Sequence, residues 1–110
     1  MATMECENLD PALLDAMRIH FGTPTRSVQV RVGEGLNEGE IWWVVILDRQ
    51  ADDAYEWGIS TFLTNAPGGR NFYTWISLDG ADTWGSVEWE GERLVRGQSA
   101  LEKARECLDI

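Results

Sequence analysis

The sequence predicts a two-layer α+β domain. Along the chain, the strands of an antiparallel meander sheet come after one terminal helix and before another. Three observations predict this fold: an apolar stripe at helical spacing near the N-terminus, a strand-rich middle divided by turns, and a second helical stripe at the C-terminus. Consecutive strands with short connections pair as neighbours in about two-thirds of cases. We therefore expect five or six antiparallel strands, with both helices on one face of the sheet.

The first predicted element is a helix over Pro11–Phe21. Asp10 is a favoured N-cap, and a proline at the first helical position loses no needed hydrogen bond. Gly22 follows as a stop signal. Apolar residues recur at three- and four-residue steps and form one stripe for burial: Leu13, Leu14, Met17 and Phe21.

Strands with turn residues between them occupy the middle of the chain. The first four are predicted over Ser27–Val32, Glu40–Asp48, Tyr55–Leu63 and Phe72–Leu78. The first of these alternates, with its valines facing one way and Gln29 and Arg31 the other. A fifth strand is predicted over Val87–Glu90, and a turn at Gly91 would lead into a short sixth strand over Arg93–Val95.

The last predicted element is a helix that begins at Ser99. Ser99 and Glu102 match a capping box, in which the hydroxyl and the carboxylate each satisfy a backbone N–H of the first turn. Leu101, Ala104 and Leu108 follow at helical spacing and predict the buried stripe.

Length and charge limit the function classes. The chain has 110 residues, which is one domain over residues 1–110, and its formal net charge is −10. It contains no basic run, which argues against direct binding to nucleic acid or to an anionic membrane surface. No apolar run approaches the ~18 residues of a membrane span, and the N-terminus lacks the features of a signal peptide. These observations predict a cytoplasmic protein.

A bridge between Cys6 and Cys107 would contribute ~4 kcal/mol, but a reducing cytoplasm favours two free thiols.

Catalytic and metal-binding patterns are not found in the sequence. His20 is the single histidine, and it has no third group that would orient it beside Cys6 or Cys107. The acids of the Asp79 turn do not have the spacing of a calcium loop. The glycine-rich segments at Gly33 and at Ala66 match no nucleotide-binding motif. We therefore predict no catalytic residue, no metal and no cofactor.

The aromatic content is the feature that points to a site. Six tryptophans occur, and the strands over Glu40–Asp48 and Phe72–Leu78 are apolar on both faces. A sheet covered on one face needs only one apolar face. The residues assigned to the second face form a predicted partner-binding patch, with Glu88 and Glu90 as its acidic rim: Trp42, Val44, Ile46, Phe62, Tyr73 and Trp75.

Three explanations of this patch stay open: cover by loops or by the segment around Trp84, a homodimer interface, and a docking site for another protein. The sequence favours a small acidic, non-enzymatic protein-binding module. Its partner would be a basic or nucleic-acid-binding protein, as for phage anti-defence inhibitors and immunity proteins. The alternative is a small-molecule-binding or enzymatic α+β domain that has an aromatic-lined pocket and uses Cys6, His20 or Arg70.

Overall fold

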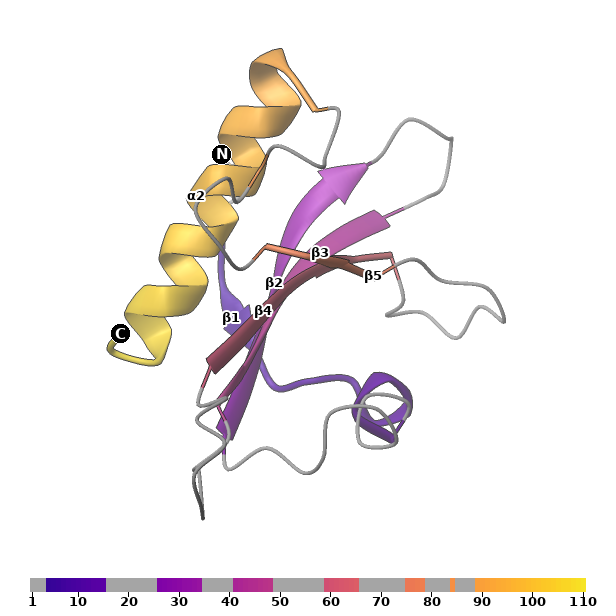
Figure 1. Ribbon diagram of the computed structural model, residues 1–110, viewed down its shortest axis with the longest axis vertical. Helices are drawn as coiled ribbons and strands as arrows, with labels where there is room; N and C mark the ends of the chain where they lie inside the picture. The colour runs from indigo at the N-terminus through magenta and orange to yellow at the C-terminus, as the bar shows by residue number, and fades with distance from the viewer. Residues whose placement is uncertain are drawn as a thin grey trace.

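The computed structural model describes residues 4–15, 26–34, 41–48, 59–65, 75–78, 84 and 89–110. These residues form an antiparallel sheet and a long C-terminal helix, which is an α+β arrangement (Figure 1). The elements are β1 (Cys6–Glu7), β2 (Arg26–Glu34), β3 (Ile41–Asp48), β4 (Ile59–Thr64), β5 (Trp75–Ser77) and α2 (Gly91–Cys107).

The sheet is a meander, as the short connections predict. The five strands lie in the order β1-β2-β3-β4-β5, and each pairs antiparallel with the next. The four predicted middle strands correspond to β2 to β5. The remaining strand is β1, which the sequence did not predict. Of the predicted strand over Val87–Glu90, only Trp89 and Glu90 are described, and neither is in a strand.

Helix α2 begins eight residues earlier than the sequence predicted. It starts at Gly91 with Glu90 as its N-cap, and no side-chain hydrogen bond closes this end. The predicted sixth strand over Arg93–Val95 is therefore wrong, and so is the capping box, because Ser99 lies inside the helix and is exposed. The helical spacing explains the difference, since the buried positions Leu101, Ala104 and Leu108 continue upstream to Gly97.

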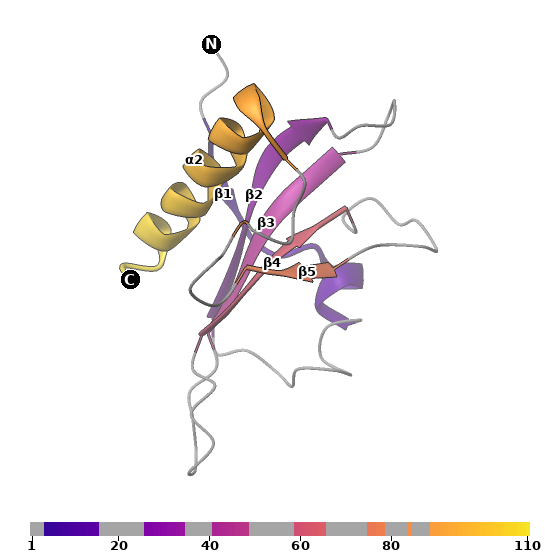
Figure 2. The same ribbon diagram turned by 45° about the horizontal axis from the view of Figure 1, so that its top comes forward.

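The N-terminal helix is described over residues 11–15, where the Leu14 N–H donates to the Asp10 carbonyl at 2.8 Å. The remainder of the predicted Pro11–Phe21 helix lies outside the described residues. Figures 1 and 2 show this helical turn on the opposite side of the sheet from α2. The expectation that both helices share one face is therefore wrong.

Two hydrophobic clusters fill the two faces of the sheet. The α2 face is built from alternate positions of β2 to β4 and from the buried stripe of α2: Val28, Val30, Val32, Val44, Ile46, Leu63, Leu78, Ala100, Leu101, Ala104 and Leu108. The opposite face is built from the positions between them and from the N-terminal segment: Leu9, Leu13, Val45, Leu47 and Phe62. Strand β3, which is apolar on both sides, is therefore buried on both sides over residues 44–47.

A hydrogen bond connects the N-terminal segment to the opposite face. The Asp10 N–H donates to Gln29 Oε1 at 3.0 Å. Gln29 is 5% exposed, whereas the alternation in β2 predicted a solvent-facing residue. Leu9 and Leu13 flank this contact along the chain, and both are buried. A buried amide needs such a partner, so this bond helps to hold the start of the helical turn against the sheet.

Candidate functional site

The predicted partner-binding patch does not form one surface. Val44 and Ile46 are 0% exposed and belong to the cluster beneath α2, so neither can contact a partner in the folded chain. Trp42 is partly buried against the same cluster. Phe62 pairs with Val45, which places it on the opposite face, where it is also buried. The face assignment was wrong because the alternation separates the two sides of a strand without showing which side α2 covers.

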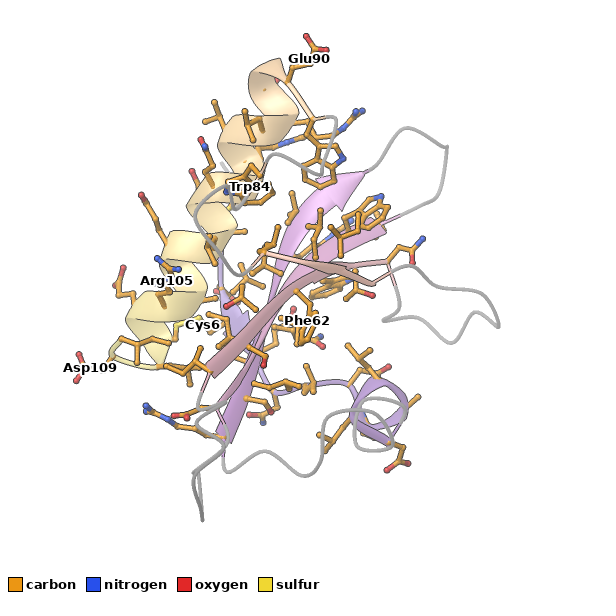
Figure 3. All side chains as sticks on the ribbon, in the orientation of Figure 1. Cys6, Phe62, Trp84, Glu90, Arg105 and Asp109 are labelled. Carbon is orange, nitrogen blue, oxygen red and sulfur yellow. A yellow bond between two sulfur atoms is a disulfide. The ribbon has the colours of Figure 1, made fainter. Side chains whose placement is uncertain are left out.

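The other predicted site residues are described only in part. The backbone of Trp75 pairs with Thr64, and its side chain lies outside the described residues, as does all of Tyr73. Glu90 is exposed at the start of α2. Glu88 also lies outside the described residues. Figure 3 shows Glu90 at one end of α2, Trp84 beside the helix and Phe62 at the sheet.

Three tryptophans gather at the N-terminal part of α2. The ring of Trp89 lies edge-on to Trp42 with centroids 5.8 Å apart, and it stacks with Trp84 at 6.2 Å. The Arg93 guanidinium carbon lies 5.9 Å from the centre of the Trp89 ring, which is cation–π range. Gly97 makes this packing possible, because a Cβ there would lie 2.8 Å from Trp84 Cη2. Trp84 therefore contributes to the cover of the α2 face, whereas cover of the opposite face by the segment around it stays a prediction.

A disulfide joins the N-terminal arm to the end of α2. Cys6 in β1 and Cys107, the last residue of the helix, are bonded, with their Cα atoms 6.6 Å apart. The expectation of two free thiols is therefore wrong. Because Cys6 is bonded, it is not the thiolate nucleophile that the enzymatic alternative needed.

A pocket of about 460 Å³ opens beside this arm. It lies where the residues before β1 run past the end of β2 and meet α2. Its lining comes from the arm (Met4, Glu5, Glu7), from β2 (Arg31, Val32, Gly33) and from α2 (Arg96). This volume falls within the range of about 300–1,000 Å³ that small-molecule sites occupy. The lining within the described residues combines charged groups with apolar surface and includes no aromatic residue, unlike the aromatic-lined pocket that the sequence offered as an alternative.

The backbone of β2 is irregular at this pocket. Arg31 pairs with Trp43, but Gly33 pairs with Trp42, so Val32 is an extra residue that forms a β-bulge. Gly33 has a φ of +132°, a region that residues with a side chain rarely adopt. A Cβ at Gly33 would also lie 3.6 Å from Arg96 Nη1. The Arg96 guanidinium therefore lies against the strand at the bulge, within van der Waals range of the Gly33 position.

The pocket carries charges of both signs. Glu5 and Glu7 provide two carboxylates, and Arg31 and Arg96 provide two guanidinium groups. No hydrogen bond or ion pair involves these four side chains within the described residues. Arg96 Nε is buried and has no hydrogen-bond partner among the described residues, so the inner part of this side chain is enclosed by protein rather than by solvent. The site can therefore offer both acceptors and donors to a bound molecule.

Sequence reasoning missed every residue of this pocket. Gly33 was interpreted as the start of a loop, and Arg31 as a solvent-facing strand residue. Arg96 was placed after a short strand, where it would not meet β2. The helical spacing upstream of Leu101 is the signal that could have placed Arg96 on α2. Nothing in the sequence indicates that the arm lies beside the same strand.

No group of three or more His, Cys, Asp or Glu in the described residues is placed to hold a metal ion. His20 and Arg70, which the enzymatic alternative named, lie outside those residues. None of the helices that the structure describes combines the length and apolar character needed to cross a membrane.

The fold and the site define a small α+β protein with a helix-covered meander sheet and a charged pocket at its first strand. Comparison with protein-family models, with curated proteins and with solved structures gives no match for this chain.

Proposed function

We propose that this chain is a small acidic, non-enzymatic protein-binding module that inhibits a basic or nucleic-acid-binding partner, as immunity proteins and phage anti-defence inhibitors do. The supporting observation is where the negative charge lies along the chain. Residues 91–110 contain four acids and four bases, so the whole net charge of −10 falls in residues 1–90. A net negative charge on a small protein steers its association with an oppositely charged surface.

The proposal places the partner on the sheet side of the molecule rather than on the outer face of α2. The outer face of α2 carries both positive and negative charges. Lys103 Nζ lies 3.9 Å from Glu106 Oε1 there. Among residues 1–90, the exposed acids that the structure describes include Glu5, Glu7, Asp15 and Glu90. Glu90 belongs to the acidic rim that we proposed from the sequence, and Glu88 completes it in the proposal. The predicted apolar contacts Val44, Ile46 and Phe62 are buried and do not take part.

The proposal is tested by affinity capture with two matched variants as bait. Asp15→Asn with Glu90→Gln removes two exposed charges from the acidic part, and Glu102→Gln with Glu106→Gln removes two from α2. We expect the wild type and the variant with two changes in α2 to capture the same basic protein equally well. The variant with Asp15→Asn and Glu90→Gln should capture this protein several-fold more slowly. Raising the salt from about 0.05 to about 0.5 M should slow its association far more than it speeds dissociation. Equal loss with both variants, or no salt response, would contradict the proposal.

A second copy of this chain is the other partner that the sequence allows. Sedimentation of the purified chain distinguishes the two, because a homodimer changes mass with concentration and needs no second protein. The cytoplasmic location that the sequence predicted is an open point of this proposal. The disulfide argues for a more oxidising compartment, because cytoplasmic thiols are usually kept reduced. Alkylation of the thiols in intact cells of the native host, followed by mass spectrometry, decides this point.

Small-molecule binding is the second candidate function, and the pocket of about 460 Å³ is the observation that favours it. Its enzymatic version is weakened because Cys6 is in a disulfide. A binding role needs only the charged lining of the pocket.

A further inference from the structure

We propose that the pocket between the N-terminal arm, β2 and Arg96 binds a small zwitterionic ligand of the amino-acid class. The ligand carboxylate would meet the two guanidinium groups, and its ammonium group would meet the two carboxylates. This inference develops the small-molecule candidate and does not require the protein partner proposed above.

The charge balance of the pocket selects this class of ligand. Two carboxylates and two guanidinium groups line one pocket and are not paired with each other. A simple anion would be attracted by Arg31 and Arg96 but repelled by Glu5 and Glu7, and a simple cation would face the reverse. A neutral molecule with separated charges satisfies both pairs, and charge-assisted hydrogen bonds are the strong ones.

Arg96 is held ready for a carboxylate before the ligand arrives. Its Nε is buried, and its Nη1 lies beside Gly33, so the planar group is positioned by packing at both ends. A guanidinium that is already fixed loses less side-chain freedom when it binds a planar carboxylate. Gly33 is required by its backbone conformation, a φ of +132°, rather than by a lack of room, because a Cβ there would make ordinary van der Waals contact with the guanidinium, 3.6 Å from Nη1.

The disulfide fixes the acidic wall of the pocket. Cys6 lies between Glu5 and Glu7 in the sequence, and its bond to Cys107 anchors this part of the arm to α2. Strand β1 has two residues, which pair with Val30 and Gln29, and so short a strand is weakly held by its backbone alone. Both carboxylates therefore owe their position to the disulfide, and the binding site depends on it.

Heteronuclear NMR titration of the intact, oxidised chain tests the proposal. Glycine, L-lysine and L-glutamate are the zwitterionic probes, and acetate and butylamine are the probes with one charge. We expect amide shifts at residues 4–7, 31–33 and 96 with at least one zwitterion, and at least tenfold weaker binding of acetate and butylamine. The proposal is overturned if no zwitterion shifts these amides, or if acetate or butylamine binds as well as the best zwitterion.

Variants then separate a ligand contact from a general effect on folding. Arg96→Gln and, separately, the exposed Arg31→Gln should each weaken zwitterion binding about tenfold, the loss of one charge-assisted hydrogen bond. Arg105→Gln, on the same helix but outside the pocket lining, is the matched control and should bind normally. Thermal unfolding of each variant shows that it is folded. Unchanged affinity in both Arg96→Gln and Arg31→Gln would overturn the site.

Reduction gives an independent readout. Treatment with dithiothreitol, or Cys6→Ser with Cys107→Ser, should weaken zwitterion binding several-fold in a chain that stays folded by circular dichroism. Binding that is unaffected by removal of the disulfide would show that the arm does not form the acidic wall. Capture of a basic protein partner by the acidic part of the chain does not depend on this result, so the two proposals fail separately.

Discussion

The two faces of the sheet are both buried, yet they are covered in different ways. On one face, α2 is attached along its whole length: Trp84 and Trp89 pack on Gly97 near its start, Ala100 and Ala104 lie against the sheet in its middle, and Cys107 is bonded to Cys6 at its end. On the other face, the described cover is a short segment in which Leu9 and Leu13 are buried beside the bond from Asp10 to Gln29.

This difference shows that apolar character on both faces of a strand does not by itself mark an exposed interface. In β3, neighbouring residues point to opposite faces, and Val44 and Val45 are both 0% exposed. One is buried by a covalently attached helix and the other by a non-covalent contact of the N-terminal segment. The strand pattern is the same for both, so only the path of the chain shows what covers each face.

The largest expected effect comes from removing the covalent attachment on the α2 face. The bonded cysteines are 101 residues apart, and closing a loop of this length stabilises the folded chain by about 4–5 kcal/mol in the chain-entropy description. Cys6→Ser with Cys107→Ser should lower the free energy of unfolding by most of that amount, measured by urea denaturation. Adding a reductant should destabilise the wild type but not the variant. If the double variant unfolds like the oxidised wild type, the disulfide contributes little.

The second expected effect compares the faces directly through neighbouring residues of one strand. Val44→Ala and Val45→Ala each leave a small cavity in a fully buried site, and each should cost about 1–3 kcal/mol of stability. Chemical denaturation of the two variants is the measurement. If the face opposite α2 were open to solvent, Val45→Ala would change stability by less than about 0.5 kcal/mol. A small effect at Val45 alone would therefore break the comparison.

A smaller effect is expected where the tryptophans pack on α2. An alanine raises helix propensity over glycine by about 1 kcal/mol, yet at Gly97 its Cβ would lie 2.8 Å from Trp84 Cη2 and 3.1 Å from Trp89 Cζ3. We expect Gly97→Ala to lower the unfolding temperature, with a net cost of about 1–2 kcal/mol. The exposed neighbour provides the control, and Gln98→Ala should have almost no effect. An increase in stability with Gly97→Ala would show that the tryptophans do not pack there.

The smallest effect is expected on the outward side of α2. Ser99 is exposed inside the helix, so Ser99→Ala removes no cap and should leave stability unchanged or raise it by up to about 0.5 kcal/mol. Thermal unfolding is sensitive enough for this comparison. A loss of about 1 kcal/mol in the free energy of unfolding would instead support the capping box and a helix that begins at Ser99.

The sequence predicted the sheet well because the strands carry their own pattern. The alternation of Val28, Val30 and Val32 placed these residues on one face, and the turn residues between strands indicated the meander. The face covered by α2 could not be predicted, because both sides of β3 are equally apolar. The first turns of α2 were missed because Gly91 was interpreted as a turn and because a glycine at position 97 weakens the helical pattern.

The candidate site was predicted poorly, for a related reason. A pocket lined by the arm, by a bulge at Gly33 and by Arg96 depends on contacts between distant segments, and none of them has a local spacing. The pairing of Cys6 with Cys107 needed only two cysteines, but whether they are oxidised is not a property of their spacing. A two-residue strand such as β1 also has no periodicity to detect.

The Cys6–Cys107 bond also closes residues 6–107 into a covalent ring. One cut of the backbone at any point between these residues opens the ring without separating the pieces. A protein nicked once by a protease will therefore run as one species on a non-reducing gel and as two after reduction. Within the ring, a fragment is released only by two cuts, so the parts of the chain that cover the two faces of the sheet stay linked after a single cleavage.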